Sequence, residues 1–89
     1  MDEKRLRDLH DHLAATAERP VERTASRWLG EAEAIADDIA HGEMDASAQR
    51  ERLGKVEHLL ENVEETGDED ADGHVAAAEA ILGELLTEG

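Results

Sequence analysis

Apolar residues recur along this chain at intervals of three and four residues, the spacing of an α-helix that buries one face. The pattern is longest between residues 21 and 40. Its members are Val21, Ala25, Trp28, Ala32, Ile35 and Ile39. A seam of this kind is typical of a helix that packs against other helices at a shallow angle. We therefore expect this helix to be the spine of the fold, with Trp28 and Ile35 buried in the core.

The residues at both ends of this segment also indicate a helix. Pro20 stands at its start, where a missing backbone N–H costs nothing. Gly42 stands just past its end, where glycine can take the left-handed conformation that closes the last turn.

Two of the other segments with this period lie on either side of the spine. Residues 2–17 are predicted as the first helix, with a seam of Leu6, Leu9, Leu13 and Ala17. Asp45 or Ser47 can cap a third helix, which should run to Thr66 and stop at Gly67. Its seam consists of Leu53, Val56, Leu60 and Val63, with Leu59 widening the stripe.

A fourth helix is predicted after an acidic connector at residues 68–73. Asp72 can cap its start, because carboxylates are favourable near a helix N-terminus. Its seam consists of Val75, Ala78, Leu82 and Leu85, with Ile81 and Leu86 beside it. No segment alternates apolar and polar residues, so no strand is predicted.

Four such helices predict an all-α fold. Connections of about two to eight residues place sequential helices antiparallel. The simplest arrangement is an up-down bundle of four helices that forms one domain over residues 1–89. The alternative is a three-helix core, with the first helix packing on a dimer partner.

The balance of charge is strongly acidic. Asp and Glu number 24 against nine Lys and Arg, a formal net charge of −15. High net charge favours disorder, but the regular apolar period argues against disorder for most of the chain. Nucleic acids and anionic membranes would repel such a protein, so we expect neither as a partner.

The potential core is aliphatic and thin, because the chain has one Trp and no Phe or Tyr. A domain of this size is only marginally stable, and association with a second copy would enlarge its core. We therefore expect a homodimer. The absence of cysteine excludes disulfides and thiolate metal sites. With no long apolar segment, we expect a cytoplasmic protein, and we expect no cofactor.

Composition adds a resemblance. Only two of the nine cations are Lys, and Ala is abundant at fifteen residues. In composition and helical layout the chain resembles the small, acidic, uncharacterised helical proteins of halophilic archaea. The resemblance implies a protein adapted to molar salt, where the Debye length is about 3 Å and self-repulsion is screened.

The two signs of charge are unevenly distributed. Residues 56–89 carry eleven carboxylates and no Lys or Arg. Arg19, Arg23 and Arg27 repeat every four residues and predict a basic stripe at the start of the spine helix. We expect this stripe to pair with acidic helices, within the chain or between subunits. The alternative is a site for an anion or for an acidic partner.

Residues 68–79 fit D-x-[DN]-x-[DN]-G-x5-E, the pattern of an EF-hand calcium loop. Asp68, Asp70 and Asp72 would supply oxygens, and Glu79 would be the bidentate ligand. The flanking positions lack the apolar residues of an EF-hand, and no second loop is present. The favoured interpretation is a helix cap on a solvated acidic surface, with a calcium or magnesium site as the alternative.

Two carboxylate pairs, Glu61 with Glu64 and Glu65 with Asp68, resemble those with which all-α nucleotide pyrophosphohydrolases hold magnesium. The lysine and the second acidic motif of that family are absent, and no base, nucleophile or phosphate clamp accompanies the pairs. No two of the five histidines stand four residues apart, so no histidine-pair zinc site is predicted. We therefore expect a protein that is not an enzyme.

The favoured hypothesis for function is thus a salt-adapted, non-enzymatic protein-interaction module. The alternative is a divalent-cation-binding protein that uses residues 68–79. A magnesium-dependent hydrolase is a third and weaker hypothesis.

The charge predicts a salt-dependent fold. Because a net −15 on 89 residues repels itself in dilute buffer, compaction requires screening. Helicity and Trp28 emission should change together, in one cooperative step, as KCl rises from millimolar to molar. The measurement is circular dichroism and fluorescence across that range. Identical far-UV spectra and melting temperatures at about 50 mM and 2 M KCl would contradict the prediction.

Overall fold

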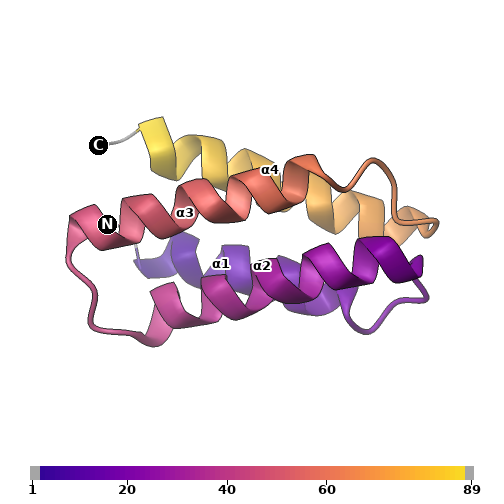
Figure 1. Ribbon diagram of the computed structural model, residues 1–89, viewed down its shortest axis with the longest axis horizontal. Coiled ribbons are helices and arrows are strands. Elements are labelled where there is room, and N and C mark those ends of the chain that lie inside the picture. Colours follow the sequence, from indigo (N-terminus) through magenta and orange to yellow (C-terminus); the bar gives the residue numbers. More distant parts are fainter. Residues whose placement is uncertain (1–2, 88–89) are drawn as a thin grey trace.

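A computed structural model describes residues 3–87 and contains four α-helices and no strand within that range. The helices are α1 Glu3–Thr16, α2 Arg23–His41, α3 Ala46–Glu61 and α4 Glu69–Thr87. Each runs antiparallel to the one before, so α1 begins and α4 ends at the same end of the bundle (Figure 1). The predicted up-down bundle is confirmed.

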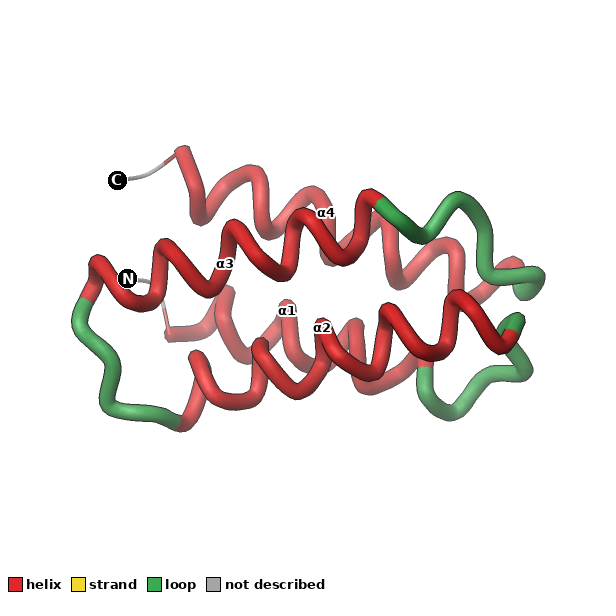
Figure 2. The backbone as a smooth tube through the Cα atoms, in the orientation of Figure 1, coloured by secondary structure: helices red, strands yellow, loops and turns green. Residues whose placement is uncertain are grey.

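Each helix packs against two neighbours, in the cyclic order α1, α2, α3, α4. Since α1 packs on α2 and α4 of its own chain, the alternative that places the first helix on a dimer partner is wrong. The bundle measures 35 × 20 × 20 Å. The α1–α2 and α3–α4 loops lie at one end and the α2–α3 loop at the other (Figure 2). No helix within residues 3–87 is long and apolar enough to cross a membrane.

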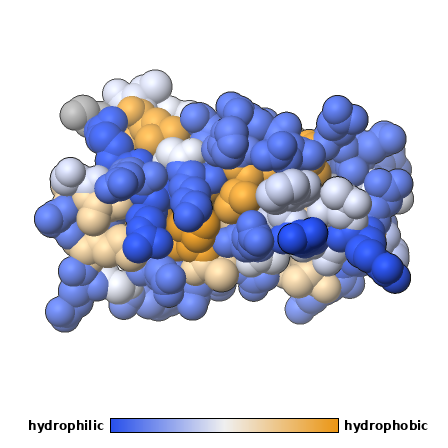
Figure 3. All heavy atoms as spheres, in the orientation of Figure 1, coloured by the Kyte–Doolittle hydropathy of each residue, from blue (hydrophilic) through white to orange (hydrophobic). Residues whose placement is uncertain are grey.

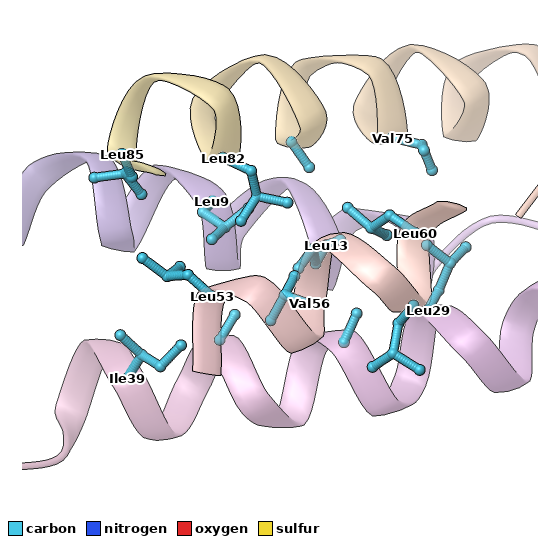
Figure 4. Close-up of a cluster of buried hydrophobic side chains, with 14 of the residues drawn as sticks. Leu9, Leu13, Leu29, Ile39, Leu53, Val56, Leu60, Val75, Leu82 and Leu85 are labelled. Atoms are coloured by element: carbon cyan, nitrogen blue, oxygen red, sulfur yellow. The ribbon is translucent and has the colours of Figure 1, made fainter. Parts of the chain in front are cut away.

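The core consists of one buried stripe on each helix. Its large members are Leu6, Leu9, Leu13, Leu29, Ile39, Leu53, Val56, Leu59, Leu60, Val75, Leu82 and Leu85. Figure 4 shows most of these side chains pointing into the space between the helices. Burial of each such side chain contributes about 1.5–3 kcal/mol. The predicted α4 seam is confirmed in full.

The buried stripe of α2 differs from the predicted one. Leu29 and Ala36 are 2% and 1% exposed, whereas Trp28 and Ile35 are half-buried at the edge of the core. The prediction that Trp28 and Ile35 are buried is wrong. The reason is that alanines dominate this stripe, so a tightly packed interior has no room for an indole ring there.

The end of α1 also differs from the prediction. Asp2, which the predicted helix included, lies outside the described residues. Thr16 is the last residue of the helix, and its buried hydroxyl donates to the carbonyl of Leu13 at 2.6 Å. This bond satisfies the hydroxyl inside the core, and the next residue, Ala17, is exposed and does not join the seam.

The ends of α2 need a similar correction. The helix begins at Arg23, so Pro20 belongs to the preceding loop. Gly42 has extended backbone angles, φ −89° and ψ 164°, not the left-handed conformation expected. Its N–H donates to the carbonyl of Asp38 at 2.7 Å. A Cβ at this position would meet the same oxygen, so close backbone approach is what favours glycine here.

The start of α3 is confirmed and its end is corrected. Asp45 caps the helix by accepting a hydrogen bond from the N–H of Ala48 at 2.8 Å. The helix ends at Glu61, before the predicted Thr66, because Asn62 stops it. The Asn62 side-chain amide donates to a carbonyl of the last turn at 2.9 Å and so satisfies a group that a longer helix would have paired. Val63 of the predicted seam is half-buried beyond the helix.

Candidate functional site

The acidic segment predicted as a connector or a calcium loop is mostly helix. Helix α4 begins at Glu69, so Asp70, Asp72 and Glu79 all lie on it. Successive helical residues point in directions about 100° apart, so carboxylates two residues apart do not converge on one point. Within residues 3–87, no group of three or more His, Asp or Glu side chains is arranged to hold a metal ion.

Asp68 caps α4, the role predicted for Asp72. Its Oδ2 accepts from the N–H of Ala71 at 3.0 Å and from the Nε of Arg19 at 2.9 Å. The second guanidinium nitrogen of Arg19 reaches Asp68 Oδ1 and Asp70 Oδ2, both at 3.2 Å. The hydrogen bond from Arg19, with that from Ala71, lowers the pKa of the Asp68 carboxyl below its ordinary value.

Asp72 has a different role in the same turn. Its Oδ1 accepts from the backbone N–H of Thr66 at 2.8 Å, and the Thr66 hydroxyl lies 2.8 Å from the same oxygen. Thr66 is fully buried although it lies in a loop. Its carbonyl accepts from the N–H of Glu22, just before α2, at 2.7 Å. We call this set the loop junction: Arg19, Glu22, Thr66, Asp68 and Asp72.

The predicted arginine stripe is confirmed only at Arg19. Arg23 and Arg27 are exposed, and neither forms an ion pair within the described part of the chain. Two arginines outside the stripe also reach α4. Arg5 of α1 lies 3.5 Å from Glu84, and Arg50 of α3 donates to the carbonyl of Leu86 at 3.0 Å. The cationic part of the chain therefore contacts its acidic last helix at three points.

Histidines form pairs that their sequence spacing did not reveal. His12 of α1 and His74 of α4 place their Nδ1 atoms 2.9 Å apart. His10 of α1 and His41 of α2 meet edge to face, with ring centroids 6.0 Å apart. The Asp37 carboxylate lies 2.8 Å from His41 and 3.7 Å from His10. Both pairs join different helices, so only the three-dimensional fold reveals them.

The half-buried Trp28 and Ile35 lie on the flank of α2 that faces α3. The opposite flank carries Asp37, which lies beside a histidine of α1. On this flank, where the start of α2 lies near the end of α3, Thr24 and Val63 line one shallow hollow. Figure 3, viewed from the α2 and α3 side, shows hydrophobic residues at the surface along the middle of this side, bordered by hydrophilic ones.

Charged residues border this apolar strip. On α2 they are the acidic Glu31 and Asp38, and on α3 the basic Arg52 and Lys55. All four are exposed, and none forms an ion pair among residues 3–87. We call this surface the α2–α3 face; it comprises Trp28, Glu31, Ile35, Asp38, Arg52, Lys55, Leu59 and Val63.

The carboxylate pairs that resemble a pyrophosphohydrolase motif do not share a helix face. Glu61 is the last residue of α3, and Glu64 and Glu65 lie in the following loop. Asp68 is engaged by Arg19. The pairs therefore lack the helical framework that would aim two carboxylates at one metal ion.

The pKa of Asp68 predicts how stability depends on pH. Because the folded pKa lies below the unfolded one, the Arg19–Asp68 pair stabilises fully above about pH 4 and loses its contribution as pH falls through the folded pKa. Asp68→Asn should keep the cap but remove the charge, lowering the melting temperature by a few degrees at pH 6. Thermal melts of wild type and variant should converge as pH falls toward 2.

The control for this measurement is Glu69→Gln, which removes an exposed carboxylate from the same helix turn. It should shift the melting temperature much less than Asp68→Asn at pH 6. Equal shifts for the two variants would show that the Arg19–Asp68 contact contributes nothing of its own.

We expect that residues 68–79 do not bind calcium in solution. A calcium ion needs six to eight oxygens at about 2.3–2.6 Å, and helix α4 would have to unwind to bring Asp70 and Glu79 together. Calorimetry in about 1 M KCl should show no saturable heat at micromolar calcium, and Asp70→Asn should leave the melting temperature nearly unchanged. A rise of several degrees with calcium, abolished by Asp70→Asn, would sink this prediction.

Comparison with known proteins identifies a family for this chain. No curated protein and no solved structure matches the chain. A family model described as a domain of unknown function (DUF8152) matches residues 5–89, which include α2, α3 and α4 and nearly all of α1. The chain therefore belongs to the family of the domain of unknown function DUF8152.

Proposed function

We propose that this protein is a non-enzymatic helical interaction module whose α2–α3 face binds a second copy of the chain. The observation that carries the proposal is the position of Trp28 and Ile35. Both are large apolar side chains, and both stay half-buried at the surface although α2 has a complete buried stripe. Removal of this apolar surface from water would stabilise a dimer by about 25 cal/mol for each Å² buried, before the costs of association.

The charges on the α2–α3 face favour a second copy over another partner, because the face complements itself. A two-fold axis parallel to the helices places α2 of each copy over α3 of the other. Thr24 near the start of α2 and Val63 just after α3 line the same hollow. Counting from there along the two antiparallel helices places Glu31 at about the level of Lys55. Glu31 of one copy then faces the partner subunit's Lys55, and the reverse pair forms on the other side.

The dimensions of the bundle also suit this proposal. One long side measures 35 × 20 Å, comparable with the roughly 800 Å² that each partner buries in a stable complex. The apolar strip would lie at the centre of that area and the charged residues at its rim, as in most protein interfaces.

The proposal includes a salt-rich setting. Two copies carry a combined formal charge of −30, twice the −15 of one chain, so long-range repulsion opposes association in dilute buffer. Molar salt screens this repulsion but leaves burial of apolar surface in place. The acidic composition thus supports a module that assembles at high ionic strength.

Light scattering tests the dimer directly. In about 2 M KCl the wild type should have twice the chain mass of 9.7 kDa. Ile35→Glu should make it monomeric, because the charge would lie at the centre of the interface. The matched control is Ile81→Glu, which changes another half-buried isoleucine. Ile81 lies seven residues after His74, on the side of α4 that faces α1, so this variant should remain a dimer.

Two results would contradict the proposal. One is a monomeric wild type in molar salt, and the other is equal loss of the dimer in Ile35→Glu and Ile81→Glu when circular dichroism shows both folded.

The orientation of the two subunits relative to each other has its own test at about 0.5 M KCl. Glu31→Lys and Lys55→Glu should each weaken the dimer, and mixing the two variants should restore it, because opposite charges then face each other at both pairs.

A further inference from the structure

His12 and His74 bring two imidazole rings together where α1 packs on α4. Their Nδ1 atoms are 2.9 Å apart, the ring centroids are 5.2 Å apart, and the planes are inclined by 43°. Both residues are half-buried, so water reaches them. A neutral imidazole has one N–H and one lone pair. The Nδ1–H of one ring must therefore donate a hydrogen bond to the Nδ1 of the other. If that proton moves to Nε2 of its own ring, both Nδ1 lone pairs become available to a metal ion.

We propose that His12 and His74 form a binding site for a divalent transition-metal ion of the zinc, nickel and copper class. The two Nδ1 atoms ligate the ion, and water completes the coordination. Zinc–nitrogen bonds are about 2.0–2.1 Å, so two nitrogens on a tetrahedral ion lie about 3.3 Å apart. The rings would have to separate by only about 0.4 Å from the distance in the structure, with a modest rotation about χ2.

The ligand chemistry selects the metal. Imidazole nitrogen suits zinc, nickel and copper, whereas calcium and magnesium prefer oxygen. Within residues 3–87, no third His, Asp or Glu side chain is placed to complete a cluster with these histidines. The site therefore has two protein ligands and open positions for water, which predicts weaker binding than a closed structural zinc site.

The charges around the two rings favour a cation. Asp8 precedes His12 by one helical turn, and Asp70 precedes His74 by one turn, so each acid lies on the same helix side as its histidine. Arg19 binds Asp70 but not Asp8. Asp70 is one of eleven carboxylates in residues 56–89, which contain no Lys or Arg. This field raises the local concentration of any cation, and the nitrogen ligands then discriminate among them.

A bound ion would join the first helix of the bundle to the last. The two histidines are 62 residues apart in sequence, so an unfolded chain does not hold them together. An ion that binds only the folded state raises its stability. The site lies between α1 and α4, on the other side of the bundle from the α2–α3 face (Figure 1), so it does not depend on the proposed dimer.

Thermal melts of the whole chain test the site, in about 1 M KCl at pH 7.5 without chelator. Zinc or nickel chloride at about 100 μM should raise the melting temperature by several degrees, and EDTA should reverse the rise. Magnesium and calcium at the same concentration should have no effect. His12→Gln and His74→Gln should each abolish the rise. The matched controls, His10→Gln and His41→Gln, alter the other histidine pair and should retain it.

A measurement on the wild type keeps the proposal testable if a variant fails to fold. In nitrogen-detected or long-range proton–nitrogen NMR spectra, zinc should shift the ring resonances of His12 and His74 and leave those of His58 in place. Shifts confined to His10 and His41 would place the ion beside Asp37 and overturn the proposal. The absence of any shift or melting-temperature change would show that His12 and His74 form only a hydrogen bond.

Discussion

The start of helix α4 depends on contacts that cross between two loops at one end of the bundle. Arg19 holds Asp68 in place to cap the helix, while Asp72 receives the backbone N–H of Thr66. The bonds to Asp72 satisfy the backbone N–H and the hydroxyl of Thr66, which is fully buried and out of reach of water. Once α4 starts at Glu69, the acidic residues that follow point in different directions around it. The same start sets the register of α4 along α1, on which the histidine contact depends.

Charge repulsion over the whole surface opposes folding, whereas a few contacts between arginines and helix α4 stabilise the fold. A net charge of −15 repels itself over the whole surface. The first part of the chain supplies the cations that oppose this, and three of them reach α4: Arg5, Arg19 and Arg50. Arg19 makes the best geometry, because two of its nitrogens meet both oxygens of one carboxylate. Such a close pair resists screening better than the diffuse repulsion does, so we expect salt to favour the folded state.

The sequence was sufficient for the four helices, their order, the seam of α4 and the three leucines of the α1 seam, because these follow from a local period. It was insufficient where two local patterns competed. Trp28 and Leu29 both continue the α2 seam with acceptable spacing, and only packing against alanine-rich surroundings decides for Leu29. The sequence predicted an aspartate cap for α4 but placed it at Asp72, whereas Asp68 is the cap. The distant Arg19 holds Asp68 in position, and nothing in the local sequence indicates that contact. The same reason hid the contact between His12 and His74, which chain topology alone brings together.

The two proposed sites use opposite sides of one thin bundle, and this separation has a physical consequence. A core of aliphatic side chains and alanines gives each helix pair little stability to spare. Association through the α2–α3 face would stabilise the helices that carry Trp28 and Ile35, whereas a metal ion at His12 and His74 would stabilise the other pair. Because every helix packs on a neighbour from each pair, stabilisation of one side would reach the other through the shared core. Metal binding would then favour dimers by raising the population of folded chains, without touching the interface.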